Sequence, residues 1–172
     1  MKSVHIPIAH CLLGLALCVG ASVPARADEV SATEPQGVVA ALKASGDDAV
    51  LTHDDSGDPL IQARIGGWAT QIVFYDCNEI THGACQSLQF SANFQPEKPF
   101  DSVAAAAFAR DNRFAAVTVG ADKSVNVSWD VVTGKGIDPS VFALVVKSYR
   151  LALDTIGTQV FVSHPRLASA SR

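Results

Sequence analysis

Two stretches of strict apolar–polar alternation, 87–94 and 125–131, constrain the fold of this chain more than any other feature. A period of two places every second side chain on the same face of an extended strand, so each stretch has one apolar and one polar face. Antiparallel sheets commonly bury one face and leave the other in water. The alternation therefore predicts half-buried antiparallel strands.

Turn and cap signals divide the rest of the chain. Gly66-Gly67 predicts a hairpin turn, and Asp101 and Asp138-Pro139 are typical helix starts. Because hairpins without helical crossovers dominate, the predicted fold class is α+β, a twisted antiparallel sheet with three helices on one face. The expected helices cover 36–44, 102–111 and 139–156, and the expected strands cover 49–53, 60–65, 68–76, 87–94, 114–119 and 125–131.

The helices should each bury one side. In the second helix we expect Val103, Ala107 and Phe108 to face inward, and Gly157 is expected to end the third. A single apolar stripe should run along that third helix at helical spacing. Its members are Phe142, Val145, Tyr149, Ala152 and Ile156.

Residues 1–27 are typical of a secretory signal peptide. Lys2 precedes an apolar run over 6–19, and Ala25-Arg26-Ala27 has the small-x-small pattern of a cleavage site. We expect cleavage after Ala27 and a periplasmic or secreted mature chain. The run is too short for a membrane span and no second apolar block follows it, so no span is expected after cleavage. A retained anchor, or a lipid on Cys18, is the alternative.

The mature chain should hold one domain. Residues 28–35 are expected to be a flexible segment, 36–162 the α+β domain, and 163–172 a flexible tail. Loss of Lys2 and Arg26 with the signal leaves 11 basic and 17 acidic residues, a net charge of −6. The basic residues are scattered, and nucleic-acid binding requires a concentrated positive surface. Nucleic acid is therefore excluded as an expected partner.

Cys77 and Cys85 are the two cysteines of the mature chain. An even pair this close in the sequence of an exported protein predicts a disulfide. Zinc is the alternative, with His82 as the nearby third ligand, but the spacing is wider than in zinc knuckles. A redox-active pair more often has two intervening residues.

No catalytic or cofactor motif occurs in the chain. The nucleophile elbow, the P-loop, the dinucleotide-binding glycine motif and the H-E-x-x-H motif are all missing, so we expect no enzyme activity and no cofactor. His53, His82 and His164 lie far apart in the sequence and are expected to be solvated polar residues. A small hydrolase, whose Asp and His side chains converge only in space, remains the alternative.

Asp54, Asp55 and Asp58 raise the question of a cation site. Three carboxylates in five residues could bind calcium, but Pro59 stands where an EF-hand requires glycine. Asp, Ser and Gly are also the residues of an ordinary turn. We therefore expect a turn and no metal, and keep a cation-binding module as an alternative.

The polar sides of the predicted strands form one candidate binding surface. If the apolar sides face the core, the outward side chains are amides and hydroxyls with one aromatic ring and few charges. Such a surface could bind a peptide or a partner sheet, although an ordinary solvated face has the same composition. Its candidate residues are Gln71, Tyr75, Gln89, Ser91, Asn93, Asn126, Ser128 and Asp130.

Four segments of the chain, 54–61, 72–77, 85–92 and 112–115, carry a further signal. Together they resemble the YbjN-domain family, whose members are labelled bacterial sensory transduction regulators. The cysteine-flanked segments are similar to the exported branch of that family, and the resemblance spans 36–157. It implies a fold similar to type III secretion chaperones, often dimeric, and implies no catalytic residues. The Ala-rich second helix departs from the more polar helix of many relatives.

These observations predict a non-enzymatic periplasmic protein that acts by binding. We expect a chaperone-like or regulatory module that contacts an unidentified protein partner through its sheet or a helix surface, and that forms a homodimer.

Overall fold

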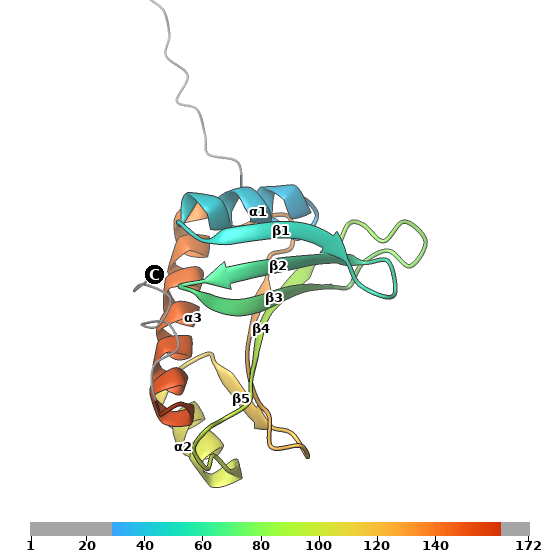
Figure 1. Cartoon of the computed structure of the whole chain (residues 1–172). Coiled ribbons are helices and arrows are strands. Elements are labelled where there is room, and N and C mark those ends of the chain that lie inside the picture. Colours follow the sequence, from blue (N-terminus) through green and yellow to red (C-terminus); the bar gives the residue numbers. More distant parts are fainter. Residues whose placement is uncertain (1–28, 163–172) are drawn as a thin grey trace, which may run out of the picture.

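The computed structural model describes residues 29–162, which form one antiparallel sheet with three helices against one of its faces (Figure 1). The six strands lie in the order β1-β2-β3-β4-β6-β5. The predicted α+β class is confirmed. The elements are α1 Pro35–Ala44, β1 Asp48–His53, β2 Pro59–Ile65, β3 Trp68–Tyr75, β4 Ser87–Phe94, α2 Ser102–Asp111, β5 Ala116–Val119, β6 Val125–Val132 and α3 Pro139–Val160.

The two alternating stretches are neighbouring strands at the centre of the sheet. β4 and β6 pair antiparallel, with Phe90 opposite Trp129, and both side chains lie on the buried face. The polar residues between them point to the other face, as a period of two requires. Each edge strand has a helix beside it, α1 along β1 and α2 along β5 (Figure 1).

Helix α3 covers the buried face of the sheet with large apolar side chains. The Phe90 ring lies 5.3 Å from the ring of Tyr149 and 6.2 Å from that of Phe142, centroid to centroid. The Tyr149 hydroxyl donates to the carbonyl oxygen of Val127 at 3.3 Å. Burial raises the pKa of Tyr149 well above its usual value, so this hydroxyl remains a neutral donor.

The third helix is longer than predicted and buries a slightly different stripe. Gly157 is a buried residue inside the helix, which continues to Val160. The backbone N–H groups of Glu97 and Lys98 donate to the Val160 carbonyl at 2.8 and 3.0 Å, so a distant segment satisfies the helix end. Val146 is fully buried where Val145 was expected, and Val145 is half-buried.

The second helix begins as predicted but turns a different side inward. The Asp101 carboxylate accepts from the N–H groups of Val103 and Ala104 at 3.0 and 2.9 Å. The Val103 side chain, predicted to face inward, is 74% exposed, and the buried residues of α2 are Ala105 and Phe108. The reason is that residues three apart share a helix face, and Phe108 fixes that face.

Phe114 lies outside the strand that it was predicted to begin. Its φ of 70° is in the left-handed region, which an extended strand does not use, and β5 begins two residues later. Its exposed ring contacts Trp129 at 5.5 Å, and the Arg113 guanidinium lies 4.7 Å from the Phe114 ring centroid. Phe114 makes these two ring contacts from its position outside the strand.

Part of the segment 28–35, which the sequence predicts to be flexible, packs against the rest of the fold. Val30 and Ile137 exchange two backbone hydrogen bonds of 2.9 Å, and Val30 and Ala32 are buried. The Ala32 N–H donates to the buried Thr133 hydroxyl. The predicted signal peptide, its cleavage site and the predicted tail lie outside the described residues.

Candidate functional site

The face of the sheet opposite the helices gathers the polar residues that the sequence predicted to share a surface. Strand register places Gln71 opposite Ser91, and Ser91 opposite Ser128, in one row across β3, β4 and β6. We call this the outer face. All eight predicted residues lie on it, namely Gln71, Tyr75, Gln89, Ser91, Asn93, Asn126, Ser128 and Asp130.

Several side chains of this face are hydrogen-bonded to one another. The Tyr75 hydroxyl donates to the Gln89 side-chain oxygen at 3.4 Å, and the Gln89 amide nitrogen donates to the Asp130 carboxylate at 2.8 Å. The Asn126 amide nitrogen donates to the Ser91 hydroxyl oxygen at 2.8 Å and to the Asn93 side-chain oxygen at 3.1 Å. These groups already have partners, so a ligand gains less from them.

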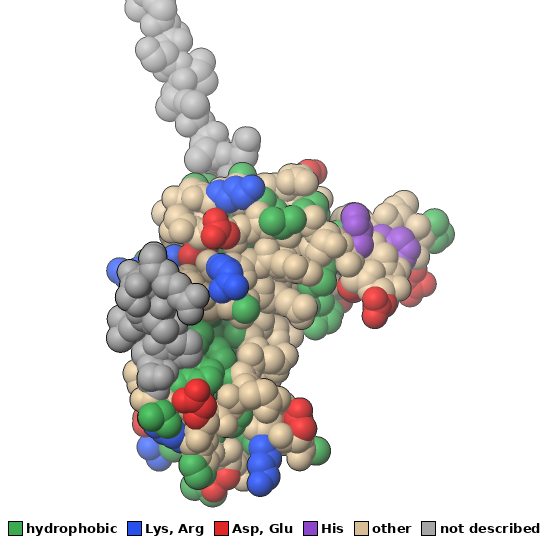
Figure 2. Space-filling model, in the orientation of Figure 1, with side chains coloured by type: hydrophobic (Ala, Val, Ile, Leu, Met, Phe, Trp, Pro, Cys, Tyr) green, Lys and Arg blue, Asp and Glu red, His purple; other side chains and the backbone are tan. Residues whose placement is uncertain are grey.

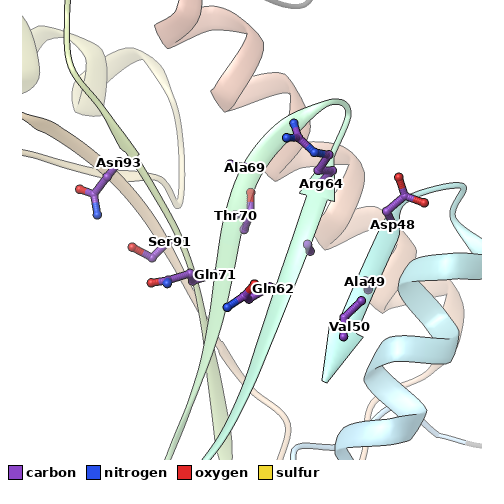
Figure 3. A pocket seen from close by; sticks show the side chains of 11 residues that line it. Asp48, Ala49, Val50, Gln62, Arg64, Ala69, Thr70, Gln71, Ser91 and Asn93 are labelled. Atoms are coloured by element: carbon purple, nitrogen blue, oxygen red, sulfur yellow. The ribbon is translucent and has the colours of Figure 1, made fainter. Parts of the chain in front are cut away.

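A hollow of about 730 Å³ opens on the other part of the outer face, over β1 to β4 (Figure 3). The small side chains of Ala69 and Ser91 leave this space between longer neighbours. The volume lies within the range of about 300–1,000 Å³ usual for ligand sites. Three predicted residues, Gln71, Ser91 and Asn93, line the hollow, and the other five do not.

The centre of the hollow holds two amide side chains that have no hydrogen-bond partner among the described residues. Gln62 and Gln71 are directly opposite each other on β2 and β3 and lie close together in Figure 3. Both are exposed, and neither side chain forms a hydrogen bond with any residue between 29 and 162. Each amide therefore offers two N–H donors and a carbonyl acceptor to whatever occupies the hollow.

Two opposite charges stand at one end of the hollow. Asp48 on β1 is directly opposite Arg64 on β2, yet no ion pair joins them in the part of the chain that the structure describes. The Arg64 Nη1 instead donates to the Gly67 carbonyl oxygen at 3.3 Å. Both charged groups are exposed to the hollow.

Strands β1 and β2 contribute residues to this surface that are absent from the predicted set. Asp48, Val50, Gln62 and Arg64 alternate with buried residues, as the outward residues of β4 do, and Ala69 is the exposed residue before Gln71. The same period-two signal could have identified them. These residues line the hollow because the strand order places β1 at the edge of the sheet, beside β2.

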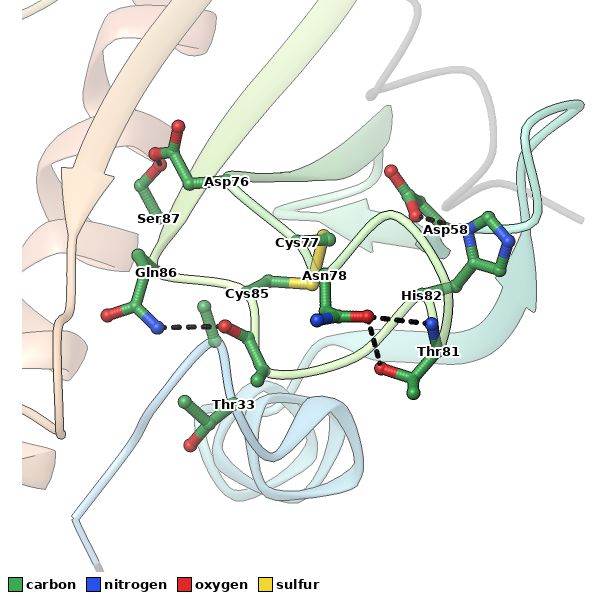
Figure 4. Close-up of a disulfide and its surroundings, with 12 residues drawn as sticks. Thr33, Asp58, Asp76, Cys77, Asn78, Thr81, His82, Cys85, Gln86 and Ser87 are labelled. Atoms are coloured by element: carbon green, nitrogen blue, oxygen red, sulfur yellow. Dashed lines mark hydrogen bonds and ion pairs between the residues drawn. A yellow bond between two sulfur atoms is a disulfide. The ribbon is translucent and has the colours of Figure 1, made fainter.

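The predicted disulfide is present between Cys77 and Cys85, in the loop that connects β3 to β4 (Figure 4). Inside the loop, the side-chain oxygen of Asn78 accepts from Ile80 N–H, Thr81 N–H and the Thr81 hydroxyl at 2.9–3.1 Å. The disulfide and these bonds hold the loop in one shape. Ile80, which lies in the loop between the two cysteines, has 88% of its surface exposed.

The loop closed by the Cys77–Cys85 disulfide contacts the turn that follows β1. His82 Nδ1 and the Asp58 carboxylate lie 2.8 Å apart, so His82, predicted to be a solvated polar residue, is paired with a carboxylate. Figure 2 shows histidine side chains gathered on the lobe that these loops build. His53 is exposed at the end of β1, and His164 lies outside the described residues.

In the described part of the chain, the His82–Asp58 pair gives the hydrolase alternative a base and a carboxylate, but no nucleophile is hydrogen-bonded to them. Within residues 29–162 no hydroxyl is hydrogen-bonded to His82 or Asp58, and the neighbouring Thr81 hydroxyl is bonded to Asn78. The hollow on the outer face contains no histidine. A catalytic arrangement requires the nucleophile within reach of its base.

Two of the three aspartates of the turn already have hydrogen-bond partners. The Asp54 carboxylate accepts from the N–H groups of Ser56 and Asp58 at 2.8 and 3.0 Å, which is the geometry of an Asx turn. Asp58 is paired with His82. In the described part of the chain no three His, Cys, Asp or Glu side chains converge as a metal site would require.

The fold and this surface define a small α+β protein with a one-sided sheet and an open polar hollow. Residues 34–161 match the YbjN family, described as "putative bacterial sensory transduction regulator". This match covers well over half of the sequence, and the chain belongs to the YbjN family. No curated protein matches the chain. None of the helices between residues 29 and 162 has the length and hydropathy needed to cross a membrane.

Proposed function

We propose that this chain is a non-enzymatic binding protein that holds an extended peptide or protein segment in the hollow on its outer face. The observation that supports this function best is that Gln62 and Gln71, at the centre of the hollow, have no side-chain hydrogen bond to any residue in the range 29–162. A side-chain amide has the same donor and acceptor groups as a peptide bond, so a row of amides can bond a main chain of varied sequence. Chaperone-like and regulatory roles both need such a surface.

The family description as a regulator agrees with a function by contact. The hydrolase alternative is supported by the His82–Asp58 pair alone, and in the aspartate turn the carboxylates of Asp54 and Asp58 already have partners. A homodimer, which the family resemblance implies, stays a prediction that sedimentation of the purified chain can test.

We further propose that the chain works outside the cytoplasm. The Cys77–Cys85 disulfide is compatible with an oxidising compartment, where such bonds persist. Mass spectrometry of the chain recovered from a bacterial periplasmic fraction should show Asp28 as the first residue. A cytoplasmic chain that retains residues 1–27 and free thiols would contradict this location.

The binding function is tested by filling the hollow. Ala69 and Ala116 are exposed alanines on the same outer face, but only Ala69 lines the hollow. Fluorescence anisotropy would measure binding of a library of labelled ten-residue peptides to the wild type, Ala69→Trp and the matched control Ala116→Trp. We expect Ala69→Trp to weaken binding about tenfold or more, a loss of about 1.4 kcal/mol, and Ala116→Trp to leave it within about twofold.

Two results would overturn the proposal. The first is a wild-type chain that binds no peptide of the library at millimolar concentration. The second is equal weakening by both tryptophan variants, which would place the binding elsewhere. Urea unfolding of each variant shows whether it has remained folded.

A further inference from the structure

The two charged side chains of the hollow could pair with each other from their positions, but they do not. Asp48 and Arg64 are cross-strand partners, and side chains in such positions lie close enough to pair. Arg64 nevertheless directs one N–H group to the Gly67 carbonyl, and the Asp48 carboxylate has no hydrogen bond to any residue from 29 to 162. A guanidinium has five N–H donors, so four remain for a ligand.

The position of the two charges relative to the two amides determines which ligand could contact all four groups. On β2, Arg64 is two residues from Gln62, so the two side chains point to the same side of the sheet and are neighbours along the strand. A segment bonded by Gln62 and Gln71 therefore passes beside the two charges. Because these charges have opposite signs, a ligand with a single charge would meet attraction at one and repulsion at the other.

We propose that the bound peptide carries a carboxylate that contacts Arg64 and a basic group that contacts Asp48. This inference rests on the proposed function and specifies its ligand. The planar guanidinium accommodates a carboxylate through two parallel hydrogen bonds, which are stronger than bonds between neutral groups. We assign this carboxylate to an acidic side chain within the segment, and the free C-terminus is the other source that the experiment tests.

The experiment uses one neutral ten-residue peptide background in four versions, measured by calorimetric titration. One version carries Glu and Lys two positions apart, which places both side chains on the same side of an extended peptide. Two versions carry Gln in place of one of them, and the last carries Gln at both places. A fifth peptide without the internal Glu is compared with a free and an amidated C-terminus, which separates the two sources of the carboxylate. The proteins are the wild type, Arg64→Gln, Asp48→Asn and Arg110→Gln.

Arg110→Gln is the matched control, because Arg110 is an exposed arginine on α2, outside the hollow. We expect loss of the carboxylate to weaken wild-type binding about tenfold, and to change Arg64→Gln binding by less than about twofold. Asp48→Asn should abolish the advantage of Lys in the same way. Arg110→Gln should behave as the wild type, which excludes an effect of net charge.

The outcomes separate this inference from the function beneath it. If the wild type binds all four peptides equally, the charge pairing is wrong and the peptide-binding hollow stands. If Arg64→Gln and Arg110→Gln lose affinity alike, the effect is non-specific attraction and the inference fails. If no peptide binds at all, both proposals fail.

Discussion

Asp47 and Arg150, 103 residues apart, form a buried ion pair where α1, the β2–β3 turn and α3 meet. Arg150 Nη2 lies 2.9 and 2.8 Å from the two oxygens of the Asp47 carboxylate, whose side chain is 2% exposed. The Gly66 N–H donates to the same carboxylate at 2.9 Å. The pair thus connects three segments that are remote in the sequence.

Replacing Arg150 should destabilise the fold by leaving a buried charge unpaired. We expect Arg150→Met to lower the free energy of unfolding by about 2–3 kcal/mol, below the usual cost of a broken buried pair because Arg150 is partly exposed. Urea unfolding measures the change, with Lys147→Met on the exposed side of α3 as the control. Equal stability of the two variants would show that the pair contributes nothing.

Gly66 should be required for two separate reasons. Its φ is +58°, and a Cβ there would lie 2.7 Å from the Arg150 Cγ. Gly46 also has a positive φ, but a Cβ would meet nothing within 4 Å. Gly46→Ala should cost about 1 kcal/mol from backbone strain alone, and Gly66→Ala about 1 kcal/mol more from the clash. Thermal unfolding that ranks the two variants the other way would contradict this.

Removal of the disulfide should lower stability without affecting the hollow. The loop between Cys77 and Cys85 is short, and the chain-entropy model assigns its cross-link about 2–3 kcal/mol. The double variant Cys77→Ser/Cys85→Ser should unfold at lower urea concentration than the oxidised wild type and should match the wild type in reductant. Peptide affinity should change by less than about twofold, because neither cysteine lines the hollow. Loss of affinity would mean that the loop contributes to binding.

Stability should fall at alkaline pH because of Tyr149. Burial raises its pKa in the folded state above the ordinary 10.0, so above that pH the unfolded chain releases a proton that the folded chain retains. Unfolding is therefore favoured as pH rises, by up to about 1.4 kcal/mol per pH unit. Tyr149→Phe should be less stable than the wild type at pH 8, with a smaller further loss between pH 10 and 11. Identical pH slopes for the two proteins would show that Tyr149 does not cause the loss.

Several features could be predicted from the sequence because their causes are local. Alternation over 87–94 and 125–131 assigns each side chain to a face without knowledge of the rest of the chain, and both polar faces prove to be outward. Asp101 and Asp138 cap their helices through N–H groups two or three residues away. The disulfide is likewise a property of two nearby cysteines.

Other features depend on contacts between remote segments, which no local pattern contains. The end of α3 at Val160 depends on N–H groups donated from 97 and 98, and the pairing of His82 with Asp58 depends on two loops meeting. The hollow requires β1 and β2 to extend the sheet beyond β3, so that Gln62 meets Gln71. Periodicity determined which side chains point outward, whereas strand order and register decided which of them remain unpaired, because a hydrogen-bond partner is set by distance in space and not by distance along the chain.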